Sequence, residues 1–398
     1  MKIALVVPGR FHAFDLACAL LARGHAVTVF TNYPAWAAAR FGVPARCVRS
    51  CWPHGIAARV AGWGHDTFGS PVSEAALHRW FGRWAAARVS RERWDVILCW
   101  SGVGEETFRR VPRGHALRIC HRSSSHIRTQ ARLLKEESQR VGCPIDHPSP
   151  WIIAREEREY TLADVIYVPS TFTHDSFIEE GVPPDRLAMI PLGVNIGAFR
   201  PPPAVINTRC RRLLAGHPLQ VLTVGTVSFR KGLWDARDIV MALDPTHVRF
   251  RFVGPVLPEA ARVVAALRAR ADFLPAQPQH TLVGQYAEGD LFLLPTIEDG
   301  FPLVLAQAAA GGLPILTTPN GAGTDLVQEG STGWVLPIRT PHAFIERLQW
   351  CHRHRPELAA MAQAIPETYR PRDWANVAAD LERLCQGSWP MPRSGARP

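Results

Sequence analysis

The chain has 398 residues, of which 47% are apolar and 20% are charged, and this balance excludes an intrinsically disordered protein. Its length suits two domains that each bury a core. No apolar run approaches the ~20 residues that cross a bilayer. The opening MKIALVVPGR is also too short for the ~7–15-residue apolar core of a signal peptide, so we expect a cytoplasmic protein.

The formal net charge of +10 favours anionic partners such as nucleotides, phosphorylated substrates or a membrane surface. Nucleic acid is not favoured, because the arginines are dispersed and no basic run alternates with aromatic residues. Residues 79–94 predict an amphipathic helix with Trp80, Trp84 and Ala87 on one face. This helix either packs on its domain or contacts lipid headgroups. The nine cysteines have no repeated spacing, so we expect free thiols and no metal site.

The first thirty residues predict a βαβ unit. The run KIALVVP suits a strand buried on both faces, residues 13–23 have the apolar spacing of a helix, and residues 25–30 suit a second strand. Gly24 stands where the helix needs a C-terminal cap. Units of this kind build parallel doubly wound sheets. Further strands are expected at residues 95–100, 116–120 and 164–170.

A second α/β domain is expected after a proline-rich hinge. The segment MIPLGVNIGAFRPPP, residues 189–203, combines turns and prolines and predicts no regular element. Strand and helix alternation restarts at residue 219, with further strands at residues 249–254, 290–295 and 313–318. The tail from about Gly387 has a composition typical of disorder.

Polar residues follow the expected strands, and ligands of open parallel sheets bind at the carboxyl ends of strands. After the strand at residue 219 come Ser228, Arg230, Lys231 and Gly232, with a helix opening near Leu233. Two cations and a glycine at a helix start predict an anion site. The alternative is a solvated basic turn.

The strand at residues 290–295 is followed by Glu298, Asp299, Gly300, Phe301 and Pro302. Proline is favoured at the first helical position, so a helix is expected over residues 302–310, ending at Gly-Gly. The amides of Gly300 and Phe301 can then face the cleft beside the Asp299 carboxylate, which could accept sugar hydroxyls or face developing positive charge. Alternatively, Asp299 is a simple helix cap.

Two other turns that follow expected strands are also candidates for ligand contacts. HRSSSH, from His121 to His126, follows the strand at residues 116–120 and offers polar contacts to a ligand, although a histidine there can equally be structural. PNGAGTDLV, residues 319–327, contains Gly321 and allows the backbone to approach a phosphate.

These segments resemble a bacterial family 4 (group 1) glycosyltransferase of the retaining GT-B class. The resemblance covers nearly the whole chain, through the opening βαβ unit and the segments EREYTLADVIYVPSTFT, IPLGVNIGAFRP, VGTVSFRKG, LFLLPTIEDGFPLVLAQAAAGGLPILTT and GAGTDLVQEGSTGWVLP. It implies two facing doubly wound Rossmann-like domains with a cleft between them. Residues 1–198 would form the acceptor side and residues 199–371 the nucleotide-sugar side. Residues 372–398 would be a helix that crosses back to the N-terminal domain, followed by the tail.

The resemblance implies a hexosyltransferase-type enzyme. It would move a sugar from a nucleotide-sugar donor to a glycan, glycolipid or lipid-linked acceptor, with retention and by front-face attack. No metal and no cofactor are implied. A peripheral position at the inner membrane face would suit a lipid-linked acceptor. Two alternatives stay open: a catalytically silent nucleotide-sugar or glycan-binding protein that supports a partner transferase, and another activity such as a nucleotide-sugar epimerase or phosphorylase.

The resemblance also assigns site residues. Arg230 and Lys231 match the basic pair that binds the donor diphosphate. Asp299 matches the first acid of the family's E-x7-E motif, near the donor sugar. Gly300 and Phe301 match the loop whose amides face that sugar. The remaining donor-contacting candidates of the C-terminal half are Gly225, Ser228, Glu298, Pro302, Leu303 and Gly321.

Gln307 stands where the second acid of that motif usually holds the ribose. An amide still makes hydrogen bonds but loses a charge-assisted one, a difference of roughly 1–2 kcal/mol, or about tenfold in donor affinity. We therefore expect an active enzyme. His126 is our first choice for the family's N-domain histidine beside the reacting centre, and His121 is the second. Gly9 and Arg10 stand in the first loop, which would approach the acceptor or a phosphate.

Overall fold

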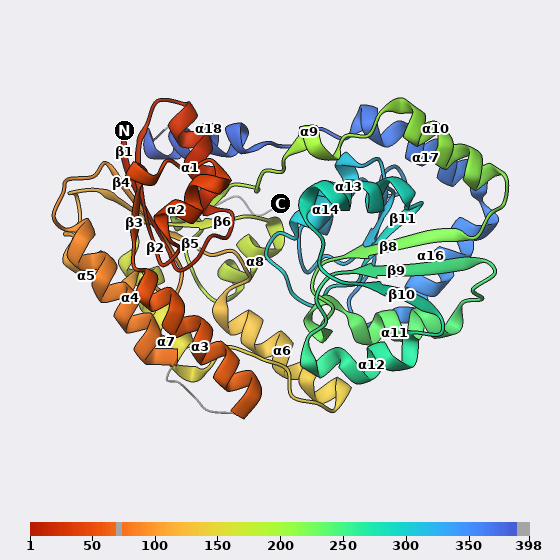
Figure 1. The fold of residues 1–398 in the computed structure, drawn as a ribbon, viewed down its shortest axis with the longest axis horizontal. Helices are drawn as coiled ribbons and strands as arrows, with labels where there is room; N and C mark the ends of the chain where they lie inside the picture. Colours follow the sequence, from red (N-terminus) through yellow and green to blue (C-terminus); the bar gives the residue numbers. More distant parts are fainter. Residues whose placement is uncertain (69–73, 388–398) are drawn as a thin grey trace.

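The computed structural model describes the fold of residues 1–68 and 74–387. Two parallel sheets, each covered by helices, form an N-terminal and a C-terminal domain that lie side by side (Figure 1). The predicted fold class is therefore confirmed. The expected disorder of the tail concerns residues that lie almost wholly outside the described part of the chain.

The N-terminal sheet has its strands in the order β3-β2-β1-β4-β5-β6-β7 within the described residues, and all of its pairings are parallel. Ile3 to Val7 are fully buried, as a continuous apolar run at the centre of a doubly wound sheet requires. The strands are β1 (Lys2–Val7), β2 (Ala26–Thr31), β3 (Val48–Ser50), β4 (Val96–Trp100), β5 (Leu117–His121), β6 (Val165–Val168) and β7 (Leu187–Met189).

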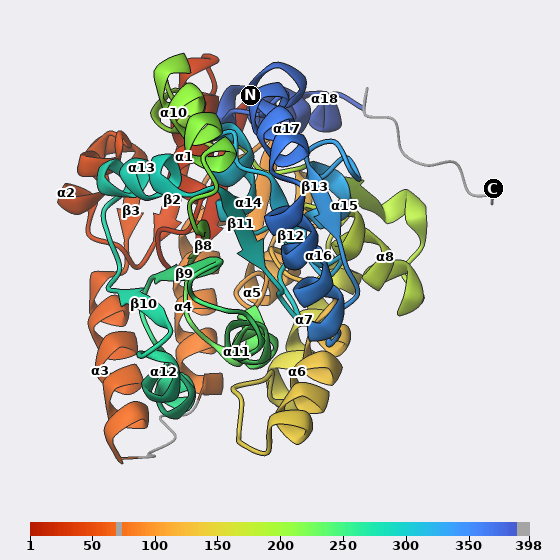
Figure 2. The same ribbon diagram turned by 90° about the vertical axis from the view of Figure 1, so that its right-hand side faces the viewer.

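Helices pack on both faces of this sheet (Figures 1 and 2). The first follows the predicted boundaries within a residue, and Gly24 after it has a φ of 84°, in the left-handed region. The helices are α1 (Ala13–Ala22), α2 (Ala35–Ala38), α3 (Trp52–Phe68), α4 (Glu74–Val89), α5 (Glu105–Arg110), α6 (Ile127–Val141), α7 (Pro150–Leu162) and α8 (Thr171–Glu179).

Helix α4 corrects the prediction for residues 79–94 in part, because it begins earlier, ends at Val89 and buries a face that includes the half-buried Trp84 but not Trp80. Its core-facing residues include Phe81, Ala85 and Val89, whereas the side chain of Trp80 is 42% exposed. The prediction relied on the tryptophans and missed part of the buried face, because several small residues of this helix also face the core.

The C-terminal sheet has the order β10-β9-β8-β11-β12-β13 within the described residues, again with parallel pairings. Its strands are β8 (Leu219–Val224), β9 (Val248–Val253), β10 (Ala271–Leu274), β11 (Leu291–Leu294), β12 (Ile315–Thr317) and β13 (Gly333–Val335). Its helices are α10 (Pro203–Leu214), α11 (Leu233–Ala242), α12 (Ala261–Leu267), α13 (Gln279–Glu288), α14 (Leu303–Ala310), α15 (Gly323–Leu326), α16 (Pro341–Arg353) and α17 (Arg355–Thr368).

Two crossings connect the domains and run beside each other at the top of Figure 1. The first contains a short helix, α9 (Ile196–Phe199), where the sequence predicted no regular element. The second leads to α18 (Trp374–Cys385), which packs on α1 with Val377 and Leu381 in the N-terminal core. The amide of Val194 donates to the carbonyl of Arg372 at 2.8 Å, so the two crossings are bonded together. The two connections between the domains therefore lie together, at one end of the domain interface.

Candidate functional site

Three loops at the carboxyl ends of β8, β11 and β12 are bonded into one unit. The amide of Ile297 donates to the Arg230 carbonyl at 3.0 Å, and the amide of Asp299 donates to the Asn320 carbonyl at 3.0 Å. The side-chain amide of Asn320 in turn donates to the Ile297 carbonyl at 2.9 Å. Gly232 closes the first loop with a φ of 82°, and a Cβ there would lie 1.9 Å from the Pro295 carbonyl oxygen. The structure thus brings the predicted basic turn and the predicted acidic turn together.

Lys231 and Asp299 form an ion pair within this unit. Burial and the neighbouring Arg230 lower the pKa of Lys231 to about 7, against the opposing effect of Glu298. The reading of this segment as a solvated basic turn is therefore wrong. Asp299 is also not the cap of α14, whose N-cap is Pro302 and has no side-chain cap bond. The pair leaves one partly buried cation beside one carboxylate at the predicted position of donor phosphate and sugar.

Glu298 is fully buried between the two domains. One of its carboxylate oxygens accepts from the amide and the hydroxyl of Ser125, at 3.0 and 2.8 Å. The other accepts from Gln130 at 3.1 Å and lies 2.8 Å from the Arg230 guanidinium. Burial raises the pKa of Glu298, but Arg230 and the bonds from Ser125 outweigh it and hold the pKa below its ordinary value. A charged carboxylate of one domain is thus satisfied mainly by the other.

Gly300 lies directly against the loop after β5 of the N-terminal domain. A Cβ at this position would lie 1.8 Å from the carbonyl oxygen of Ser123 in the loop after β5. Its own carbonyl accepts from the Ser170 hydroxyl at 2.6 Å, again across the interface. Only glycine fits here while the domains are in contact.

We expect Gly300→Ala to lower kcat/KM about 100-fold. The added methyl group would push the domains apart, and a displacement of about 1 Å between reacting groups costs about that factor. The measurement is steady-state kinetics, with the radius of gyration from X-ray scattering as a second readout. Gly284→Ala is the matched control, since a Cβ at Gly284 in α13 meets nothing within 4 Å. Equal activity of both variants would show that this contact has no role in turnover.

His121 and His126 lie in different surroundings. His121 is fully buried at the end of β5, and its Nε2 lies 2.7 Å from Nε2 of His12 and 2.9 Å from the Ser123 hydroxyl. His126 is the N-cap of α6, and its ring packs against Tyr160 and Phe177.

Burial lowers the pKa of His126 to about 4, and it also lowers the pKa of His121, whose hydrogen bonds define its tautomer. Nδ1 of His121 is 3.3 Å from the Tyr167 carbonyl, which only accepts, so Nδ1 carries the proton and Nε2 is the acceptor. Burial lowers the pKa of His121 well below its ordinary value and the pKa of His12 to about 4, so both rings are neutral near pH 7. His12 also stacks on Trp374 of α18, with ring centroids 5.7 Å apart. Of the two predicted histidines, His121 is the one connected to the first loop and to the C-terminal helix.

The remaining predicted residues surround these groups. Gly9 accepts from the Thr31 hydroxyl at 2.7 Å, and Arg10 is exposed with its guanidinium 4.1 Å from the Phe41 ring. Phe301 is buried in the N-terminal domain's core cluster, and Leu303 packs against that cluster from α14. Gly225 follows β8, Ser228 is the N-cap of the turn that contains Lys231, and Gly321 lies against Pro302.

Gln307 lies on α14, and its side-chain oxygen accepts from the Tyr286 hydroxyl at 3.0 Å. Its amide nitrogen remains available as a donor.

A cavity of 540 Å³ opens beside the basic turn and is lined by both domains. Ser228, Arg230 and Lys231 line it from the C-terminal domain, and Arg122 and Gln130 line it from the N-terminal domain. Its walls mix cations, acids and apolar side chains, a combination suited to a polar ligand with both charged and hydroxyl groups.

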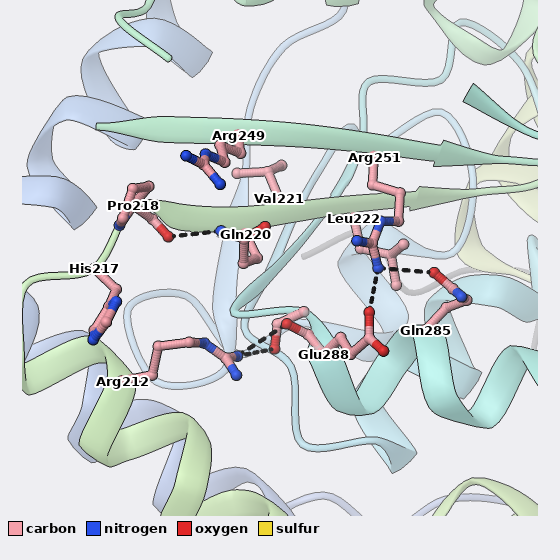
Figure 3. Close-up of a pocket in the computed structure, with 11 residues that line it drawn as sticks. Arg212, His217, Pro218, Gln220, Val221, Leu222, Arg249, Arg251, Gln285 and Glu288 are labelled. Atoms are coloured by element: carbon pink, nitrogen blue, oxygen red, sulfur yellow. Dashed lines mark hydrogen bonds and ion pairs between the residues drawn. The ribbon is translucent and has the colours of Figure 1, made fainter. Parts of the chain in front are cut away.

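A second cavity, of 280 Å³, lies toward the amino ends of β8 and β9 (Figure 3). Two of the three arginines that line it are already paired: Arg212 contacts Asp290 and the carbonyls of Glu288 and Gly289, and Arg251 contacts Gln285 and Glu288. Ligands of open parallel sheets bind at the carboxyl ends of the strands, whereas this cavity lies at the amino ends. The donor site is therefore assigned to the first cavity.

Sequence reasoning missed His12 and Gln130, and it named the turn that contains Ser125 without assigning that serine a partner. His12 lies in the same first loop as the predicted residues Gly9 and Arg10. Its role depends on a contact with His121, which is 109 positions away in the sequence. Ser125 and Gln130 bind Glu298 across more than 160 residues of sequence. The serine-rich turn after β5 was the one available signal.

Two Rossmann-like domains that face each other across such a site define the GT-B class of proteins. Two family models match: "Glycosyltransferase Family 4" over residues 10–197 and "Glycosyl transferases group 1" over residues 218–354. Together they span most of the chain, which belongs to the family 4, group 1 glycosyltransferases.

Individual relatives agree with this assignment. D-inositol 3-phosphate glycosyltransferase of Corynebacterium urealyticum is 27% identical over 259 residues, which cover 60% of each chain. The chain spans about half the length of the curated relatives it matches. The fold is shared with HepE of Anabaena, at a TM-score of 0.68 and 16% identity over 97% of this chain and 100% of that one. WaaG, a glycosyltransferase involved in lipopolysaccharide biosynthesis, gives a TM-score of 0.66 at 15% identity over the same shares.

Proposed function

We propose that this protein transfers a sugar from a nucleotide-sugar to a hydroxyl of a glycan, glycolipid or lipid-linked acceptor. The observation that carries this proposal is the Lys231–Asp299 pair beside Arg230, at the carboxyl edge of the C-terminal sheet and facing the other domain. HepE, which shares the fold, has been solved with UDP and with UDP-glucose, and this supports a nucleoside diphosphate as leaving group.

The chemistry follows from the charges in the site. As the bond from the anomeric carbon to the diphosphate oxygen breaks, negative charge grows on the phosphate and positive charge on the sugar. Lys231 and Arg230 stabilise the phosphate, and Asp299 lies where it can face the sugar. The acceptor oxygen attacks from the face that the phosphate leaves, and its proton passes to a phosphate oxygen. The configuration is retained, and neither a protein nucleophile nor a metal takes part.

A thermal-shift panel of UDP-, GDP-, ADP- and dTDP-sugars without metal tests donor binding, because a ligand that binds the native state raises the melting temperature. We expect one nucleotide class to give a shift. Sugar transfer to an acceptor, followed by the anomeric configuration of the product, tests the reaction. Binding without transfer or donor hydrolysis would instead identify a silent nucleotide-sugar-binding protein, and product formation without an acceptor would identify another activity of this fold.

Gln307→Glu is expected to bind the donor nucleotide roughly tenfold more tightly, because a carboxylate makes a charge-assisted bond to a ribose hydroxyl. The Tyr286 hydroxyl can donate to glutamate as it does to glutamine. Isothermal calorimetry with the nucleoside diphosphate measures the change, and Gln363→Glu at an exposed position of α17 is the control. Unchanged or weaker binding would contradict a ribose contact at this position.

A further inference from the structure

The first half of α3 carries three large apolar side chains toward solvent. Trp52, Ile56 and Val60 recur every four residues and are 55%, 53% and 61% exposed. The side toward the domain carries the buried residues His54 and Ala61, together with Gly55, where a Cβ would lie 2.5 Å from the Asn32 carbonyl oxygen. A helix that only covers a core turns its large apolar side chains inward, so their exposure here indicates a binding surface.

The same exposure continues along the edge of the N-terminal sheet. Trp36 of α2 is 66% exposed, and Phe41, three residues past the end of this helix, is 38% exposed. Figure 2 shows α2 and α3 along one side of the N-terminal domain, with β3 between them. We call the exposed side chains of Trp36, Phe41, Trp52, Ile56 and Val60 the β3-edge surface.

The segment of the chain that carries this surface has charged side chains of a single sign. Between Asp15 and Asp66 the sequence contains no acidic residue and five arginines: Arg23, Arg40, Arg46, Arg49 and Arg59. The last four are exposed. The guanidinium of Arg40 lies 5.1 Å from the Trp36 ring, so cation and aromatic ring present one common face.

We infer that the β3-edge surface docks on an anionic lipid bilayer. Tryptophans and arginines suit the headgroup layer, and the aliphatic side chains of α3 suit the layer just below it. A helix lying flat with its apolar stripe outward needs a broad, deformable partner, which favours lipid over an acidic protein. Among the helices of the described residues, none has the length and apolar character of a membrane span, so contact would be peripheral. The inference deepens the proposed function, because it would bring the site to a lipid-linked acceptor.

Co-sedimentation with vesicles tests the inference without donor or acceptor. Vesicles of phosphatidylcholine alone are compared with vesicles of equal parts phosphatidylcholine and phosphatidylglycerol. Two variants change the surface: Trp52→Ser with Ile56→Ser, and Arg46→Glu with Arg49→Glu. The matched control is Leu214→Ser with Met241→Ser, which removes apolar side chains of similar exposure, 60% and 52%, from the C-terminal domain.

Wild type and control are expected to sediment with the anionic vesicles only, less so at high salt. Each surface variant should bind at least about tenfold more weakly, since every basic residue near an anionic surface contributes measurably to binding. Wild type that stays in the supernatant with anionic vesicles overturns the inference and leaves an acidic protein as the partner to seek. Equal binding of variants and control also overturns it. Donor binding in the thermal-shift panel is independent of these results, so failure of the docking surface and failure of the proposed transfer are distinguishable.

Discussion

Lys231→Met is expected to lower kcat/KM by about 10²–10³, because it removes a preorganised cation from the leaving diphosphate in a partly buried site. The thermal shift given by the donor nucleotide should disappear in the same variant. Steady-state kinetics and the nucleotide panel measure both effects. Lys135→Met, at an exposed position of α6, is the matched control and should behave as wild type. Full activity of the Lys231 variant would remove the observation on which the proposed function rests.

The same residue predicts a dependence of donor binding on pH. The pKa of Lys231 is lowered to about 7 in the free protein, by burial first and by Arg230 second. The diphosphate diester of a nucleotide-sugar is ionised throughout this range and binds the protonated amine. Affinity should therefore fall as pH rises above about 7, with uptake of up to one proton on binding. Calorimetry at pH 8 in two buffers of different ionisation enthalpy measures this uptake, and Lys231→Met should abolish it.

Glu298→Ala is expected to cost about 3–5 kcal/mol of unfolding free energy, the usual effect of removing one partner from a buried charge pair. The variant leaves the Arg230 guanidinium, the Ser125 hydroxyl and Gln130 without their carboxylate. Since Ser125 and Gln130 belong to the other domain, part of the loss should show as domain opening. Denaturant unfolding and the radius of gyration in solution measure the two components.

Two further variants separate charge from shape. Glu298→Gln keeps the size of the side chain and should lose less stability than alanine. Glu288→Gln, a 63% exposed glutamate at the end of α13, should lose almost none. Because the folded pKa of Glu298 lies below its ordinary value, its contribution is present above the unfolded pKa and disappears as pH falls through the folded one. The difference between wild type and Glu298→Ala should therefore shrink in acid. A constant difference down to low pH would contradict a charged Glu298.

Local sequence determined the βαβ beginning and several of the long strands. A run such as Ile3 to Val7 can be satisfied in few places other than the centre of a covered parallel sheet, so it predicted its own burial. The strands β3, β7, β10 and β13 were not predicted, because three or four residues at a sheet edge carry too little apolar periodicity. The turns after β8 and β11 were predicted because glycine and proline mark them locally.

Tertiary structure decided the meaning of the individual side chains. The sequence placed Glu298 beside Asp299 as two similar acids, yet one is buried by four contacts to Ser125, Gln130 and Arg230, and the other pairs with Lys231. It offered two histidines after β5, and only folding shows His121 bonded to His12. Hydrogen bonds between domains depend on how two surfaces meet. The residue pattern within one strand or turn contains no information on how the two domains dock. The sequence therefore determined the sheets and the turns, whereas the docking of the domains determined the chemistry of each residue.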